Sequence, residues 1–100
     1  MAKGYWIARL DITDQAKYDA YRAANGAAFK RYGGRFLVRG GVFEAKEGDS
    51  RSRNVVLEFP SYQAALDCYN SPEYSAAKAE RQGGTEIDLI VIEGYDGPQP

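Results

Sequence analysis

Two glycine pairs enclose a short alternating segment, GGRFLVRGG, in the first half of the chain. Arg35, Leu37 and Arg39 share one parity in this segment, and Phe36 and Val38 share the other. This two-residue period is typical of a β-strand. Glycine lacks a Cβ, so the first pair suits the end of a helix and the second pair suits a bulge or a turn. The segment therefore predicts a strand that extends to about residue 44 and carries both arginines on one face.

Three other segments alternate in the same way and predict strands, at residues 4–12, 54–60 and 85–94. Apolar and aromatic residues recur at three- and four-residue steps in the predicted helices, at residues 14–32, 62–70 and 72–82. Residues 45–53 show no period and predict a loop. The order of elements predicts an α+β, ferredoxin-like βαββαβ fold with a four-stranded antiparallel sheet and the helices on one face. We expect residues 1–94 to form one domain and residues 95–100 a flexible tail.

The last predicted strand is apolar on both of its faces. Ile87 and Leu89 point to one side, and Ile90 and Ile92 point to the other. Because the helices are expected to cover only one face of the sheet, the second apolar face needs another cover. Two copies of the chain packed face to face supply it, so we expect a homodimer.

The sequence contains no histidine and a single cysteine, Cys68. It therefore lacks the usual ligands for zinc, haem and copper, as well as the Ser-His-Asp and Cys-His arrangements of many hydrolases. We expect no metal and no other cofactor, and Cys68 is interpreted as a small core residue. A net charge of −1 gives no electrostatic reason to bind nucleic acid or a membrane surface. With no disulfide pair and no apolar run long enough to span a bilayer, a cytoplasmic location is the expectation.

Two groups of residues are candidates for a functional site. Arg9, Arg39 and Glu58 share a parity in their predicted strands, and we expect them to form a charged network on one face. This network either sets the register of the dimer or binds a small carboxylate or enolate through paired guanidinium groups. Arg51 and Arg53 lie in the predicted loop and are interpreted as solvated charges.

The second group is predicted to converge between the helices and the sheet. Its members, with Arg39, are the ligand-binding candidates: Tyr21, Asn25, Tyr69, Tyr74 and Arg81. One interpretation is ordinary tyrosine packing with satisfied hydroxyl groups. The other is a pocket in which amide and hydroxyl groups orient a small carbonyl or carboxylate ligand without a metal. Asn25 discriminates between them, because a buried amide has several hydrogen bonds to place.

Five segments occur in an order that resembles a known family: GYWIARLDITD, GGRFLVRGG, NVVLEFPS, YNSPEY and IVIEGYDG. Together they cover nearly the whole chain, and they resemble the bacterial domain-of-unknown-function family thirteen-thirty. The resemblance implies a dimeric α+β barrel of the ferredoxin-like superfamily, which also includes cofactor-free monooxygenases, muconolactone-type isomerases and haem enzymes. The haem enzymes typically use a histidine ligand, and this chain departs from them there.

The resemblance implies no particular activity, so two classes of function remain. One is a cofactor-free enzyme, similar to an isomerase or a monooxygenase, that acts on a small organic substrate. The other is a non-catalytic dimeric protein that binds or senses a small molecule. Turnover of a candidate compound separates the two.

Overall fold

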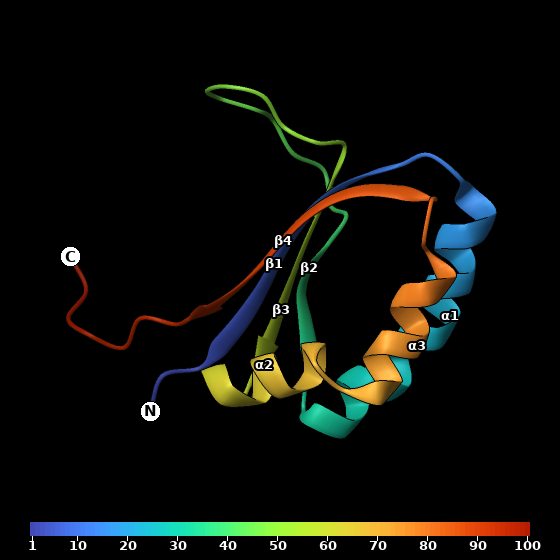
Figure 1. The fold of residues 1–100 in the computed structure, drawn as a ribbon. Coiled ribbons are helices and arrows are strands. Elements are labelled where there is room, and N and C mark those ends of the chain that lie inside the picture. The colour runs from blue at the N-terminus through green and yellow to red at the C-terminus, as the bar shows by residue number, and fades with distance from the viewer.

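The computed structural model describes residues 1–100 and consists of a four-stranded antiparallel sheet with three helices (Figure 1). In chain order the elements are β1 (Gly4–Ile12), α1 (Gln15–Tyr32), β2 (Arg35–Arg39), β3 (Arg53–Phe59), α2 (Tyr62–Tyr69), α3 (Pro72–Glu80) and β4 (Thr85–Glu93). The strands lie in the order β2-β3-β1-β4. This is the ferredoxin-like arrangement that the sequence predicts, with the second helical segment divided into α2 and α3.

The helices begin and end at the residues that local chemistry favours. Asp14, Ser61 and Ser71 precede α1, α2 and α3, and each side chain accepts a hydrogen bond from a backbone N–H in the first turn. These N-cap bonds satisfy donors that have no partner inside the helix. Pro72 occupies the first turn of α3, where its missing N–H costs nothing. Gly33 ends α1 in the left-handed conformation, with a φ of 76°.

The core lies between the sheet and the helices. Its strand residues alternate toward the helices: Trp6, Ala8, Leu10, Val55, Leu57 and Phe59. The indole of Trp6 is 1% exposed and donates a hydrogen bond to the backbone oxygen of Ala65, at 2.9 Å. Helix α2 packs directly on β1, β3 and β4, whereas α1 packs mainly against α3. Side chains therefore fill the space between α1 and the sheet, and the candidate functional site lies there.

Strand β2 contains a β-bulge at Leu37. Phe36 pairs with Leu57, but Arg39, three positions later, pairs with Val55, only two positions away on β3. The extra residue in β2 reverses the alternation of side chains beyond the bulge. Arg39 therefore faces the helices, on the same side of the sheet as Phe36.

Arg35 precedes the bulge and faces away from the helices, opposite Glu58. The prediction that Arg35 and Arg39 share one face is therefore wrong. β2 also ends at Arg39 instead of continuing to about residue 44. Gly40 adopts a φ of 68°, which turns the chain out of the sheet. Figure 1 shows the following segment extending beyond the sheet before it returns as β3.

The outer face of the sheet, which points away from the helices, carries an apolar row. The row crosses all four strands in register: Val38, Val56, Ile7 and Ile90. The two end members are the most accessible, since Val38 is 42% exposed and Ile90 is 53% exposed. None of the three helices is long and apolar enough to cross a membrane.

Candidate functional site

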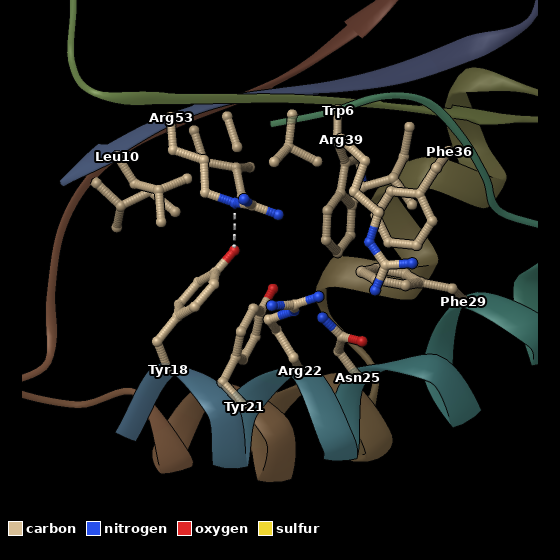
Figure 2. Close-up of a pocket in the computed structure, with 15 residues that line it drawn as sticks. Trp6, Leu10, Tyr18, Tyr21, Arg22, Asn25, Phe29, Phe36, Arg39 and Arg53 are labelled. Atoms are coloured by element: carbon tan, nitrogen blue, oxygen red, sulfur yellow. Dashed lines mark hydrogen bonds between the residues drawn. The ribbon is translucent and has the colours of Figure 1, made fainter. Parts of the chain in front are cut away.

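A pocket lies between α1 and the helix-facing side of the sheet (Figure 2). Its empty volume is about 460 Å³, part of which is open to solvent. Most of the wall is apolar and includes Trp6, Leu10, Phe29, Phe36 and Leu89. The wall therefore suits a flat, largely apolar molecule.

Three guanidinium groups surround this apolar wall. Arg22 comes from α1, Arg39 from β2 and Arg53 from β3. None of them forms a salt bridge, and no aspartate or glutamate lines the pocket. The chain as a whole has a net charge of −1, so this positive charge is a local concentration. An anion that enters the pocket meets three cations with no competing carboxylate.

Arg53 is held in place by Tyr18 and Gly40. Its Nε donates a hydrogen bond to the Tyr18 hydroxyl at 3.0 Å, drawn as a dashed line in Figure 2. A Cβ at Gly40 would clash with Nη1 of Arg53, so glycine makes room for the guanidinium. Because the Tyr18 oxygen accepts from Arg53, the Tyr18 proton remains free for another acceptor.

Arg39 stacks on an aromatic ring of the pocket wall. Its Cζ lies 4.2 Å from the centroid of the Phe36 ring. A guanidinium that stacks on a ring keeps its N–H groups, which lie in its own plane, available to other acceptors. The β-bulge at Leu37 makes this contact possible, because it turns Arg39 to the same side as Phe36.

Asn25 supplies a buried amide to the pocket wall. The residue is 6% exposed, and its amide interacts with the Tyr21 hydroxyl, which it favours in the ionised form. Figure 2 shows the amide on the pocket side of α1, near Arg22 and Tyr21. The amide atoms are not among those buried without a partner, so they reach the open space of the pocket, where a ligand can contact them.

Behind the pocket wall, Tyr21 belongs to a buried polar network. Its hydroxyl oxygen lies 2.9 Å from that of Tyr74, and Nη2 of Arg81 donates to the Tyr74 hydroxyl at 3.3 Å. Burial raises the pKa of Tyr21 far above its ordinary value. The neighbouring Asn25 amide and the Arg81 charge act in the opposite direction. Tyr21 is consequently a neutral hydroxyl group throughout the physiological pH range.

The structure brings together most of the sequence-based ligand candidates. Those that line the pocket are Tyr21, Asn25 and Arg39. Tyr74 and Arg81 do not line it but connect to it through the Tyr21 hydroxyl. Tyr69 lies apart, since its hydroxyl accepts a hydrogen bond from Lys78 at 2.9 Å and does not reach the pocket.

The structure does not bring Arg9, Arg39 and Glu58 together. Glu58 faces outward, accepts a hydrogen bond from the Tyr5 hydroxyl at 3.0 Å and lies 3.8 Å from Nε of Arg35. Arg39 lies on the opposite side of the sheet because of the bulge. Arg9 faces outward like Glu58, but it donates to a backbone oxygen of the segment between β2 and β3. In place of the predicted charged network, Glu58 contacts Tyr5 and Arg35.

Arg22 and Arg53 are absent from the sequence-based candidates, although both have a signal in the sequence. Arg22 follows Tyr18 by four positions and precedes Asn25 by three, so it belongs to the same stripe of α1. Arg53 shares its parity with Val55, but the predicted strand began one residue too late to include it. The interpretation of Arg53 as a solvated loop charge is therefore wrong.

Arg51 also differs from its interpretation as a solvated charge. Its guanidinium lies 2.9 Å from Asp11 and 2.8 Å from Asp88, and Glu86 is a third partner at 3.5 Å. These contacts raise the pKa of Arg51, chiefly through the hydrogen bonds to Asp88 and Asp11. They fasten the segment between β2 and β3 to the outer face of β1 and β4.

Comparisons with solved structures show the fold. A protein of unknown function from Rhodopseudomonas palustris is 19% identical, with a TM-score of 0.77 over 96% of this chain and 85% of that chain. SnoaB, a cofactor-independent oxygenase from Streptomyces nogalater, is 13% identical, with a TM-score of 0.62 over 100% of this chain and 97% of that chain. An ethyl tert-butyl ether d (ethd) family protein from Bacillus halodurans is 10% identical, with a TM-score of 0.58 over 95% of this chain and 100% of that chain.

Comparison at the level of sequence gives the family. No curated protein matches the chain. A family model described as Domain of unknown function (DUF1330) matches residues 3–95. This match includes all seven helices and strands and every residue of the pocket wall. The chain belongs to the DUF1330 family.

Proposed function

We propose that the pocket binds a small planar organic compound as its anion and stabilises the negative charge. The observation that carries this proposal is the set of three guanidinium groups with no carboxylate among the lining residues. Hydrogen bonds from a guanidinium to an anionic oxygen are about twice as strong as those between neutral groups. A carboxylate, a phenolate and an enolate all present such an oxygen.

The pocket wall supports a planar and partly aromatic ligand. Aromatic rings from the sheet and from α1 border the space, including Trp6, Phe29 and Phe36. Rings of this kind stack on flat molecules and exclude water from them. Exclusion of water strengthens the attraction between the ligand anion and Arg39 or Arg53.

Stabilising an enolate or a phenolate would also accelerate a reaction that passes through such an anion. A C–H or O–H group loses its proton to water, and the electron pair is delocalised onto an oxygen that the guanidinium groups hold. An isomerase returns the proton to a different atom, whereas a cofactor-free oxygenase lets dioxygen, as co-reactant, accept electrons from the anion. The likeness in fold to SnoaB, a cofactor-independent oxygenase, supports this class of enzyme. Our first proposal is therefore a cofactor-free enzyme of the isomerase or oxygenase type.

Binding without catalysis is the second candidate, and a specific observation favours it. The pocket wall has no carboxylate, and the chain has no histidine, so the usual general bases are missing. A protein that only binds or senses an acidic metabolite needs the cations and the aromatic wall but no base.

A matched set of ligands tests the proposal. Benzoate should raise the melting temperature, while benzamide, which has the same shape without the charge, should leave it unchanged. The shift with benzoate should shrink as salt is added, because salt screens the attraction. Equal shifts for the charged and the neutral compound would contradict an anion site.

Turnover then separates the two candidates. Quinols, lactones and β-dicarbonyl compounds are incubated with the protein under air, and the products are identified by mass spectrometry. A new product that depends on the protein establishes the enzyme. Compounds that stabilise the protein and remain unchanged establish the binding protein.

We also propose that a second copy of the chain covers the outer face of the sheet. The apolar row that ends at Val38 and Ile90 is exposed, and both signs of charge flank it, with Arg35 beside Glu58 on one side and Arg9 beside Asp88 on the other. A two-fold axis brings a surface patch against itself, so a patch with an apolar middle and both charges at its edges is self-complementary. Light scattering at micromolar concentration should give the mass of a dimer.

A further inference from the structure

Arg81 has surroundings that packing alone does not explain. It is the one charged side chain among the buried residues, at 7% exposed. No carboxylate pairs with it, and its Nε is buried without a hydrogen-bond partner. Its side-chain contacts are the hydroxyl of Tyr74 and the ring face of Tyr21, whose centroid lies 5.1 Å from its Cζ. A buried cation without a counterion destabilises a fold, so its presence here indicates another role.

The Tyr21 and Tyr74 oxygens lie 2.9 Å apart and either hydroxyl could donate, so we assign the direction from the partners that each group has. A guanidinium can only donate, so the Tyr74 oxygen accepts from Arg81. Tyr74 is 0% exposed, and the Tyr21 oxygen is the one other partner of its hydroxyl. The Tyr74 proton would have no acceptor unless it were donated to Tyr21. The order of donation is therefore from Arg81 to Tyr74 and from Tyr74 to Tyr21.

The last hydroxyl of this series faces the pocket. Tyr21 lines the pocket, and Figure 2 shows its hydroxyl pointing away from α1 toward the sheet. Because its oxygen already accepts from Tyr74, its own proton is left for a group inside the pocket. Each bond in such a series polarises the next, so the positive charge of Arg81 makes the Tyr21 hydroxyl a stronger donor.

We infer that Arg81, Tyr74 and Tyr21 form a directed series of hydrogen bonds that ends as a donor to the anionic oxygen of the bound ligand. This inference rests on the proposed function, since it assigns the inner contact of the same anion. Tyr21 is the binding residue, because it touches the ligand. Tyr74 and Arg81 are positioning residues, because they act through Tyr21.

Burial supports this role, because it raises the pKa of Tyr21 and keeps its proton in place at neutral pH. Burial alone would lower the pKa of Arg81, but the hydrogen bond to Tyr74 and the nearby tyrosine oxygens outweigh that effect. Arg81 therefore keeps its charge. The other charged groups that face the ligand are the guanidinium groups of Arg22, Arg39 and Arg53.

The experiment uses 4-nitrophenol as the probe, because its phenolate absorbs visible light and its phenol does not. A pH titration of the bound probe gives its pKa, which wild-type protein should lower relative to the free probe. Tyr21→Phe and Tyr74→Phe should each raise the bound pKa by about one unit and weaken phenolate binding about tenfold, as expected for loss of a hydrogen bond to a charged group.

Arg81→Met and a matched control complete the set. Arg81→Met should raise the bound pKa in the wild-type background but change it little in the Tyr74→Phe background, because the series is already interrupted there. Arg81→Lys, which keeps a charged donor, should restore part of the effect. Tyr69→Phe removes a hydroxyl that is 2.9 Å from Lys78 and outside the pocket, and it should have no effect.

The outcomes distinguish this inference from the function on which it rests. A bound pKa that is the same in Tyr74→Phe and wild type overturns the series and leaves the anion pocket intact. Wild-type protein that binds the phenol as well as the phenolate overturns the anion site, and the role of Tyr21 with it. Folding is checked by the melting temperature, which Arg81→Met should leave unchanged or raise, since it removes an unpaired buried charge.

Discussion

The two faces of the sheet use arginine in opposite ways. On the outer face two guanidinium groups lie near carboxylates, and a third, Arg9, donates to a backbone oxygen. Arg51 lies between Asp11 and Asp88, and Arg35 lies 3.8 Å from Glu58. These pairs fasten the segment between β2 and β3 to the sheet and neutralise charge beside the apolar row. Their role is explained by contacts within the chain.

The helix-facing side has four guanidinium groups and no carboxylate partner for any of them. Arg39, Arg53 and Arg81 contact aromatic rings or hydroxyl groups, and Arg22 lines the same pocket. A buried cation without a counterion reduces stability, so contacts within the chain do not explain Arg81, while the other three reach solvent at the pocket. The contrast between the faces shows that residue type alone does not identify the role of an arginine. Its neighbours indicate whether it stabilises the fold or is available to bind a ligand.

The largest expected effect tests whether the pocket arginines bind an anion. Changing Arg39→Gln together with Arg53→Gln should weaken binding of benzoate by a factor of 100 or more, because each guanidinium hydrogen bond to a carboxylate contributes about 1.5–3 kcal/mol. Isothermal titration calorimetry measures this loss. The melting temperature of the unliganded protein should change little, since neither arginine has a salt bridge to lose.

A double change on the outer face is the matched control. Arg35→Gln together with Arg51→Gln removes the same net charge but leaves the pocket intact. Benzoate should then bind as in the wild type, and the melting temperature should fall because Asp11 and Asp88 lose their partner. If both double variants weakened binding equally, net charge and not the pocket would account for the affinity.

The next effect concerns what covers the outer face. Ile90→Asp places a charge at the end of the apolar row, where the side chain is 53% exposed in the single chain. Full burial of an isoleucine contributes about 1.5–3 kcal/mol, and Ile90 has about half of its surface left to bury in each copy, so the two copies together lose roughly 1.5–3 kcal/mol and the dissociation constant should rise about 10- to 100-fold. Sedimentation velocity over a concentration series measures it. Wild-type protein that sediments as a monomer would refute the dimer before any variant is made.

A smaller effect tests whether the charges of the outer face stabilise the fold. Hydrogen bonds from the backbone and side chain of Ser52 hold the pKa of Asp11 below its usual value, and Arg51 adds to the effect. A carboxyl with a depressed folded pKa stabilises the protein above its unfolded pKa of about 4 and loses this contribution as the pH falls through the folded value. Asp11→Asn should therefore lower the melting temperature at pH 7. The difference from wild type should shrink below about pH 4, and a constant difference would show that Asp11 has no pH-linked role.

The smallest expected effect is seen at Cys68, which reports on the core beneath the pocket. Burial raises the pKa of its thiol to about 12, with a further contribution from the charge of Glu73. A neutral buried thiol reacts slowly with aromatic disulfide reagents. At pH 8 it should remain slow in wild type and in the Arg39→Gln, Arg53→Gln variant. Rapid labelling of the variant would show that its loss of binding came from a disturbed core.

The sequence predicts the fold well because each element carries its own local signal. Alternation marks the strands, and Asp14, Ser61 and Ser71 mark the starts of the helices. The bulge in β2 has no such signal, because RFLVR alternates perfectly as written and only pairing with β3 shows the extra residue. For that reason the side of the sheet on which Arg39 lies is not predictable from the sequence.

The candidate site is predictable in part. The stripe on α1 identifies Tyr21 and Asn25, and the same three- and four-residue spacing would include Arg22 if charged residues were given equal weight. The Arg81 series is different, because the direction of its hydrogen bonds depends on the absence of any other acceptor near Tyr74. Such an absence is a property of three-dimensional packing and leaves no mark on spacing or composition.

The bulge also affects how this pocket would be recognised in other proteins. Here the inward guanidinium comes three positions after the inward aromatic ring, as in Phe36 and Arg39, because one residue in between is unpaired. In a strand of regular pairing, the next inward position comes two residues after the first. A homologue without the extra residue should therefore present the same pair as F-x-R instead of F-x-x-R. Searches for this pocket should compare positions by strand pairing. A sequence pattern of fixed spacing would miss homologues that have the same pocket but lack the extra residue.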